Sequence, residues 1–250
     1  MDVLVCIKRV PVTGAKITLT ADEQEIDATY LSFAPGPHEE CAIEEAVQIV
    51  QEHGGRSAAL TLGPADAVEQ LRYAASLGID ELILLETGEE WPPMPAAQAI
   101  AAAVQAQETP FDVLLFGNES ADAGGYQVGI RVAYALGLPV VTGVKKLEFA
   151  DGKATAHRQT PTGWEIYETP LPAVFTIKEG INVPRYPSIP GKLRAKKKPV
   201  QRITPEKEAV GLEKTRLVVP ETESSEAVVL GHGADAAPQV VDMMIELGLV

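Results

Sequence analysis

Residues 113–137, VLLFGNESADAGGYQVGIRVAYALG, decide the fold. The apolar run at 111–116 predicts a buried strand, and the glycine-rich loop after it leads into a predicted helix at 125–136. Gly137 is a typical helix stop, because glycine readily adopts the left-handed conformation beyond the last turn. A strand that passes through a loop into a helix is half of a βαβ unit, so the stretch predicts a parallel sheet.

The chain upstream repeats the same order. Short apolar runs predict strands, and apolar residues at helical spacing predict helices between them. The predicted strands lie at 3–7, 58–62 and 81–85, and the predicted helices lie at 65–77, at 96–107 and between Pro37 and Gly54. Together these units predict an α/β fold with a mostly parallel, doubly wound sheet that carries helices on both faces.

The pattern changes after Pro139. Short alternating runs separated by turn residues predict a small antiparallel addition, and a further apolar run is expected to return to the main sheet. The alternating runs lie at 144–149, 154–159 and 164–167, and the returning run lies at 174–177.

The last part of the chain has few periodic patterns. Residues 180–199 hold four prolines and two glycines, and they indicate a long ordered loop rather than a disordered tail. The segment that follows is charged and poorly periodic, apart from a predicted helix at 237–247. We therefore expect a nucleotide-binding α/β domain at 1–202 and a C-terminal arm at 203–250.

Composition excludes several classes of protein. The 250 residues have a net charge of −14, which argues against a chain-wide nucleic-acid binder. The two cysteines, Cys6 and Cys41, form no C-x-x-C pair, so neither a zinc site nor disulfide stapling is expected. No apolar run is long enough to span a bilayer, and the first residues read as a strand rather than a signal peptide. We expect a soluble, cytoplasmic protein with no stable membrane insertion.

One segment departs from the acidic average. Residues 178–202 contain eight Lys or Arg and one acid, a charge of about +7, which leaves the rest of the chain at −21. A solvated charge run is the simplest reading, and a nucleic-acid patch is disfavoured because Tyr186 is the one aromatic residue among the charges. The prolines indicate a shaped loop, so a docking surface for protein partners fits this segment better.

Doubly wound sheets bind ligands beyond the carboxyl ends of their strands. The loop at 117–129 occupies such a position, and its glycines and following helix start favour an anion such as phosphate. A glycine-rich loop without a ligand is an equally good reading of the pattern. The common phosphate and dinucleotide fingerprints are absent, as are nucleophile elbows and zinc-protease motifs, so no residue is assigned a catalytic role.

Four motifs in order resemble the β subunit of electron-transfer flavoprotein. They are the opening strand at 3–10, the helix start PHEECAIEEA at 37–46, the loop at 117–129, and LPAV at 171–174 followed by INVPRYPS at 181–188 and KKKP at 196–199. The N-x-P-R-Y sequence upstream of a lysine run is the most distinctive of them. The resemblance covers roughly residues 1–200.

The resemblance implies a subunit of a heterodimer. In that family the α subunit holds most of a redox-active FAD, and the β subunit closes the FAD site on a related fold of the adenine nucleotide α-hydrolase type. The β subunit also buries a structural AMP, which a second FAD replaces in bifurcating members. Electrons pass from flavin dehydrogenases into the FAD and on to an acceptor. The chain would thus be an electron carrier and not an enzyme with catalytic residues of its own.

Site residues follow from aligning these motifs. The cofactor contacts implied are Cys6, Gly36, His38, Glu39, Leu62, Gly117, Asn118, Asp122, Tyr126, Gln127 and Val128. The docking residues implied are Ile181 as apolar anchor, with Asn182, Pro184, Arg185 and Tyr186 around it. Gly36, His38 and Tyr126 stand where the family usually has Asn, an aromatic residue and Asn. Contacts made by side chains can therefore differ here.

Two other functions share this kind of sheet. A stand-alone adenine-nucleotide-binding regulatory protein of the universal-stress type would not need the segment at 171–199, and its usual phosphate loop is absent. An ATP-dependent ligase of the α-hydrolase kind would need an S-G-G-x-D-S-type loop after the first strand, where this chain has Lys8-Arg9-Val10-Pro11. The electron-transfer reading accounts for more of the chain than either.

Overall fold

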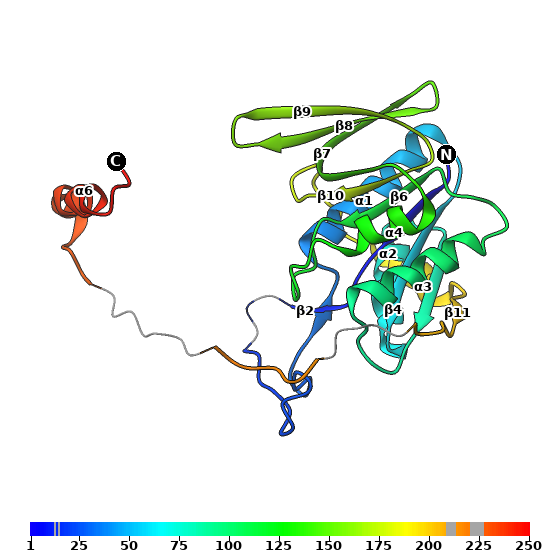
Figure 1. Cartoon of the computed structure of the whole chain (residues 1–250), viewed down its shortest axis with the longest axis horizontal. Helices are drawn as coiled ribbons and strands as arrows, with labels where there is room; N and C mark the ends of the chain where they lie inside the picture. The colour runs from blue at the N-terminus through cyan, green and yellow to red at the C-terminus, as the bar shows by residue number, and fades with distance from the viewer. Residues whose placement is uncertain (13, 15, 209–213, 221–227) are drawn as a thin grey trace.

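A single sheet of nine strands organises the computed structural model, which describes residues 1–12, 14, 16–208, 214–220 and 228–250. The strand order is β11-β5-β4-β1-β6-β10-β7-β8-β9 (Figure 1). The six strands from β11 to β10 and the start of β7 pair in parallel. The parallel strands are β1 (Val3–Cys6), β4 (Ser57–Gly63), β5 (Glu81–Glu86), β6 (Val113–Gly117), β10 (Ala173–Ile177) and β11 (Gln201–Ile203).

Helices cover both faces of this sheet. They are α1 (Pro37–His53), α2 (Val68–Leu77) with the short η1 (Ala65–Ala67) before it, α3 (Pro93–Gln105) and α4 (Val128–Leu136). Alternate residues of β1 face opposite sides, so Val3 and Val5 pack with α1 and α2, while Leu4 packs with α3 and α4. The predicted doubly wound α/β fold is confirmed.

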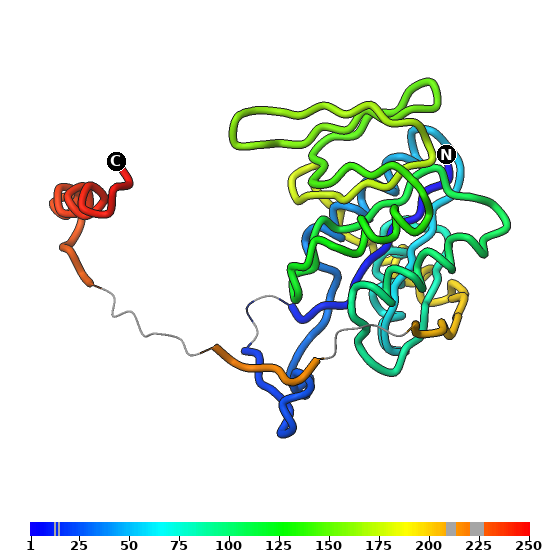
Figure 2. Tube along the Cα trace, in the orientation of Figure 1, coloured from blue at the N-terminus to red at the C-terminus, as the bar shows by residue number. Residues whose placement is uncertain are grey.

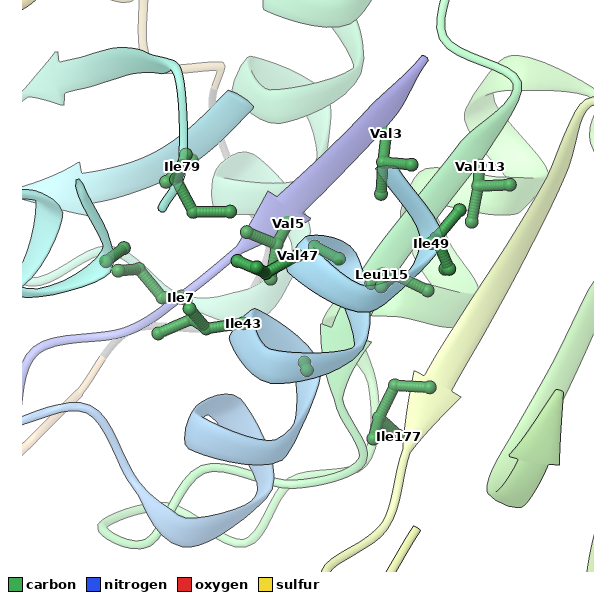
Figure 3. Packing of buried hydrophobic residues seen from close by; sticks show 14 of the residues in the cluster. Val3, Val5, Ile7, Ile43, Val47, Ile49, Ile79, Val113, Leu115 and Ile177 are labelled. Atoms are coloured by element: carbon green, nitrogen blue, oxygen red, sulfur yellow. The ribbon is translucent and has the colours of Figure 1, made fainter. Parts of the chain in front are cut away.

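Helix α1 packs with the core on one face of the sheet. Its apolar side chains Ile43 and Val47 belong to the same buried cluster as Val5 of the central strand and Ile7 after it (Figure 3). Burying an aliphatic side chain of this size contributes ~1.5–3 kcal/mol. The helix ends at Gly54, whose φ of 70° is favourable for glycine and whose N–H donates to the Val50 carbonyl.

The antiparallel addition extends the same sheet. Strand β7 (Val140–Ala150) pairs in parallel with β10 near its start and antiparallel with β8 (Lys153–Thr160) further on. Strand β9 (Gly163–Pro170) follows β8 and forms the sheet edge. A separate pair, β2 (Val10–Pro11) and β3 (Phe33–Ala34), lies near the carboxyl end of β1.

The start of α4 differs from the prediction. The helix begins at Val128 and not at Gly125, because Gly124 and Tyr126 both have φ of 54°. Left-handed residues cannot continue a right-handed helix, so these two positions keep the glycine-rich loop separate from α4.

The segment at 180–199 is also more regular than an extended loop. It contains helix α5 (Ile189–Lys197), which the prolines concealed. Pro190 lies in the first turn, where a missing N–H costs nothing, and the Ser188 hydroxyl accepts a 3.1 Å hydrogen bond from the Gly191 N–H. Strand β11 follows and adds to β5 at the other edge of the sheet.

After β11 the chain still contacts the body, where Lys207 pairs with Glu89, and its C-terminal helix lies apart from the sheet (Figure 2). The described part of the arm at 214–217 runs along the turn at 20–25, where the Leu217 N–H donates to the Glu23 carbonyl. Beyond this lie η2 (Gly233–Ala236) and the predicted last helix, α6 (Ala237–Glu246), which buries none of its residues. Among the described residues, no helix has the length and apolar character needed to cross a membrane.

Candidate functional site

The carboxyl ends of three central strands meet at one edge of the sheet. Cys6 at the end of β1 is in register with Leu60 of β4 on one side and with Phe116 of β6 on the other. The segments that follow these strands therefore start side by side. Topology thus brings together the predicted site residues Cys6, Leu62 and Gly117, although Cys6 is itself buried in the core.

Glu39 is the buried acid of this edge. It lies in the first turn of α1 and is 4% exposed. A Cβ on Gly117 would lie 2.8 Å from its carboxyl carbon, and a Cβ on Gly36 would lie 2.6 Å from its Oε2. Its side chain therefore fills the space that the missing side chains at 36 and 117 leave open.

The electrostatics of Glu39 are unusual for a carboxylate. Within the described part of the chain, its Oε2 has no hydrogen-bond partner. Burial raises the pKa of Glu39 to about 7, and the carboxylates of Asp122 and Glu40 act in the same direction. The backbone N–H of Glu39 and the Lys8 ammonium oppose the rise without cancelling it.

His38 precedes Glu39 and faces the loop after β6. Its Nε2 lies 3.9 Å from the Glu119 Oε1, and its buried Nδ1 has no partner among the described residues. Two neighbouring side chains thus present unpaired buried polar atoms at the same edge. Such atoms are costly unless a ligand or water completes them.

Lys8 fastens the loop at 118–126 to the end of β1. Its Nζ lies 2.6 Å from the Asp122 Oδ2 and 2.9 Å from the Glu90 Oε1. Burial alone would lower the Lys8 pKa, but these carboxylates raise it. Burial would raise the Asp122 pKa, and Lys8 instead holds it below the usual value. Sequence reasoning included Lys8 in a strand-end segment but did not single it out.

The start of α4 completes this loop. Gln127 caps the helix with its backbone, while its side-chain Oε1 accepts hydrogen bonds from the Arg131 guanidinium at 2.9 and 3.1 Å. The N–H groups at Val128 and just beyond it are the free donors of a helix start. A Cβ on Gly129 would lie 2.9 Å from Thr176, so glycine there lets α4 approach the sheet closely.

Two predicted site residues line a different cavity. Asn118 and Tyr126 border a space of about 220 Å³ on the β10–β7 side of the loop, together with Thr142, Arg158 and Lys178. The Asn118 Oδ1 accepts a 2.7 Å hydrogen bond from the Thr176 hydroxyl. The structure therefore divides the predicted cofactor residues between two sides of one loop. No sequence motif pointed to Arg158, which lies on the antiparallel β8.

Two of the predicted docking residues, Asn182 and Arg185, form hydrogen bonds to helix α1. Asn182 donates to the Cys41 carbonyl at 3.0 Å and to Glu45 at 2.9 Å, both on α1. The Arg185 guanidinium donates two hydrogen bonds to the carboxylate of Glu44, at 2.7 and 2.8 Å, and the Arg185 backbone N–H donates a third at 3.2 Å. These side chains hold the loop to the body.

The apolar residues of this segment behave differently. Ile181 is partly buried and packs against the core. The exposed apolar and aromatic side chains are instead Val183, Tyr186, Ile189 and Leu193. The apolar residue that sequence reasoning selected as anchor is therefore the least accessible of the group.

Comparisons with known proteins agree with the motifs. Residues 29–208 match the model of the electron transfer flavoprotein domain family. The chain is 32% identical to the electron transfer flavoprotein subunit beta of Bacillus subtilis (strain 168), over 98% of this chain and 97% of that protein. The chain belongs to the electron transfer flavoprotein β-subunit family.

Further relatives of the electron transfer flavoprotein family are similar over most of their length. The subunit beta of Syntrophomonas wolfei subsp. wolfei is 37% identical over 80% of this chain and 78% of its own. The caffeyl-CoA reductase–Etf complex subunit CarD of Acetobacterium woodii is 32% identical over 80% of this chain and 77% of its own. The resemblance seen in the motifs is thus confirmed.

Proposed function

We propose that this chain binds AMP at the edge formed by β1, β4 and β6 and closes the FAD site of a partner α subunit. The observation that carries the AMP assignment is the buried Glu39 Oε2 beside Gly36 and Gly117, which has no hydrogen-bond partner among the residues that the structure describes. The loop after β6 leads from Gly117 to the helix start at Gln127 and Val128. Unpaired buried polar atoms, a glycine cradle and helix N–H donors fit a nucleotide that offers both a base and a phosphate.

We assign nine residues to the AMP site. They are Cys6, Gly36, His38, Glu39, Leu62, Gly117, Asp122, Gln127 and Val128. Asn118 and Tyr126 remain in the proposed cofactor set, from the cavity side of the loop. The FAD, when bound, supplies the electron-transfer chemistry, and we assign no catalytic residue to this chain.

The basic segment at 178–202 is proposed to dock flavin dehydrogenases, with electrons passing on to a separate acceptor. Its positive charge opposes the acidic remainder of the chain and would steer an acidic partner surface. Asn182 and Arg185 fix the loop on α1, while Pro184 constrains the chain between them. The cytoplasmic location expected from the sequence stays a prediction.

We propose Ile189 in place of Ile181 as the apolar anchor. Ile189 is 78% exposed at the start of α5, with Tyr186 nearby in sequence and 95% exposed. A side chain that inserts into a partner must be accessible, and Ile189 is more exposed than Ile181, which is partly buried and packs against the core.

The Ile189→Ala variant tests this anchor. Losing a central apolar contact costs roughly 1–2 kcal/mol of docking, so electron delivery from the dehydrogenase should slow about tenfold. FAD content and thermal stability should stay unchanged, because Ile189 contributes little to the core. In the paired variant Ile181→Ala, thermal stability should fall, because Ile181 packs against the core. Normal transfer kinetics for Ile189→Ala would refute the assignment.

The cofactor assignment has a direct test. The chain is co-expressed with its partner α subunit, the complex is purified, and the nucleotides released on denaturation are identified by mass. One FAD and one AMP per complex are expected. Two FAD and no AMP would show that the nucleotide site takes a second flavin, and no AMP or FAD would contradict the proposed function.

A further inference from the structure

The buried carboxyl of Glu39 is not used in any ion pair of the described residues. Its Oε2 is also unpartnered among them, although nearly all of the residue is buried. A core position would be cheaper to fill with an apolar side chain, because an unpaired buried carboxyl destabilises the folded chain. This combination of burial and an unused polar atom points to a ligand contact.

We propose that Glu39 donates a hydrogen bond, as a neutral carboxylic acid, to a ring nitrogen of the bound adenine, so that nucleotide binding takes up a proton. This inference rests on the proposed AMP site. Adenine carries acceptor nitrogens in its ring and one amino donor group. A neutral carboxylic acid can donate to the ring nitrogens, whereas a carboxylate can only accept.

The surroundings of Glu39 favour its neutral form. Lys8, from the end of β1, is the nearby cation, and it is already held by Asp122 and Glu90. Asp122 from the loop after β6 and Glu40 from α1 itself both raise the pKa of Glu39. His38, beside Glu39 on α1, is turned toward Glu119. An arriving nucleotide adds further negative charge and therefore opposes ionisation of Glu39.

Glycine at two positions makes this placement of the carboxyl possible. A Cβ at residue 36 or 117 would overlap the Glu39 carboxyl group itself. The carboxyl is thus enclosed by main chain from the start of α1 and from the end of β6. Both segments are among those proposed to contact the nucleotide, so Oε2 is placed within the same site.

The sign of the pH dependence follows from this proton uptake. Below pH about 7 the Glu39 carboxyl is already protonated in the free protein, so nucleotide affinity should vary little with pH. Above that value each pH unit should weaken binding about tenfold, because one proton must be taken up. If Glu39 were instead ionised and accepted a hydrogen bond from the adenine amino group, nucleotide affinity would rise with pH.

The test measures nucleotide affinity in the full heterodimer after nucleotide removal. AMP and adenosine are titrated calorimetrically from pH about 6 to about 9, since the AMP phosphate itself titrates near 6 and adenosine does not. We expect wild-type affinity for both to fall about tenfold per unit above neutrality. Glu39→Gln keeps a donor but cannot titrate, so its affinity for adenosine should not change over this range.

Glu40→Gln is the matched control, with the same change of charge one residue further along α1. It should keep the tenfold fall in affinity per pH unit, beginning at a somewhat lower pH because the Glu40 carboxylate helps to raise the pKa of Glu39. Infrared spectroscopy of the wild-type complex tests the same proposal without any substitution, in case Glu39→Gln fails to fold. Adding AMP to the wild-type complex at pH about 8 should strengthen the infrared carbonyl band of a neutral carboxylic acid.

The possible failures can be told apart. Wild-type affinity that is constant or rises with pH, or an infrared band that does not grow, would overturn the role of Glu39 while leaving the AMP site intact. Failure of all variants to bind AMP or adenosine at any pH would overturn the proposed site and this inference together.

Discussion

At the scale of single residues, missing side chains shape the site as much as present ones. The backbone conformation of Gly117 is not left-handed, so it does not by itself require glycine. Glycine is needed there because a Cβ would come too close to the Glu39 side chain. Gly129 is explained in the same way by Phe116 and Thr176. Any larger residue would push α4 or the Glu39 carboxyl away from the strand ends, because packed interiors have little free space.

Gly117→Ala should therefore damage the site. The new methyl group would lie 2.8 Å from the Glu39 carboxyl carbon. We expect a loss of ~1–3 kcal/mol in the free energy of unfolding, measured by urea denaturation, together with weaker AMP binding. Gly88→Ala is the control, because nothing lies within 4 Å of its added Cβ. The prediction fails if Gly117→Ala is as stable as Gly88→Ala.

At the scale of elements, helix α1 joins the nucleotide site to the docking segment. Its first turn carries Glu39, and the next turns carry Glu44 and Glu45, which bond Arg185 and Asn182. Burial would raise the Glu44 pKa, but the hydrogen bonds from Arg185 hold it below the usual value. This contribution to stability is present above the ordinary carboxyl pKa of 4.5 and is lost as the pH falls through the lowered value.

Arg185→Ala should release the docking loop from α1. It leaves the Glu44 carboxylate, 3% exposed, without its cation. Because Arg185 is itself about a third exposed, we expect a loss of ~1–2 kcal/mol in stability rather than the larger cost of a fully buried pair. Amide hydrogen exchange at 181–188 should speed up, and docking of the dehydrogenase should weaken. Arg194→Ala removes an exposed charge from α5, so it should affect docking without changing loop exchange.

At the scale of the whole molecule, the described arm has more apolar surface than it buries. Val241, Met244 and Ile245 of α6 are exposed, and α6 is only ten residues long. An isolated helix of this length is marginal in water, since most helical stability comes from packing. The expectation that 203–250 packs on a partner subunit remains a proposal, and 209–213 and 221–227 lie outside the described residues.

Deleting 228–250 should separate folding from assembly. No residue of α6 is buried against the body, so the free energy of unfolding of the isolated chain should change by less than about 0.5 kcal/mol. Association with the α subunit, followed by analytical ultracentrifugation, should weaken. Ile245→Glu in the full chain should have the same effect in milder form. Unchanged heterodimer affinity for both variants would contradict the role of the arm.

Much of the fold follows from local patterns in the sequence. Strands β1, β4, β5 and β6 and helix α1 lie where apolar periodicity and glycine stops predicted them. Helix α5 and strand β11 were not predicted, because their residues carry charge and proline without a clear apolar period. Their formation depends on neighbours distant in the chain: α5 packs on α2, and β11 pairs with β5.

The candidate site shows the same division. The order of strands and glycine-rich turns was enough to predict which strand ends would meet, since parallel strands with crossover helices bring their carboxyl ends to one edge. The burial of Glu39, the Lys8–Asp122 pair and the separation of Asn118 from the β1 side depended on the folded chain. Burial and ion pairing arise between residues that are far apart in the chain; Lys8 and Asp122, for example, are 114 positions apart. A local pattern holds no information about such distances, and only packing sets them.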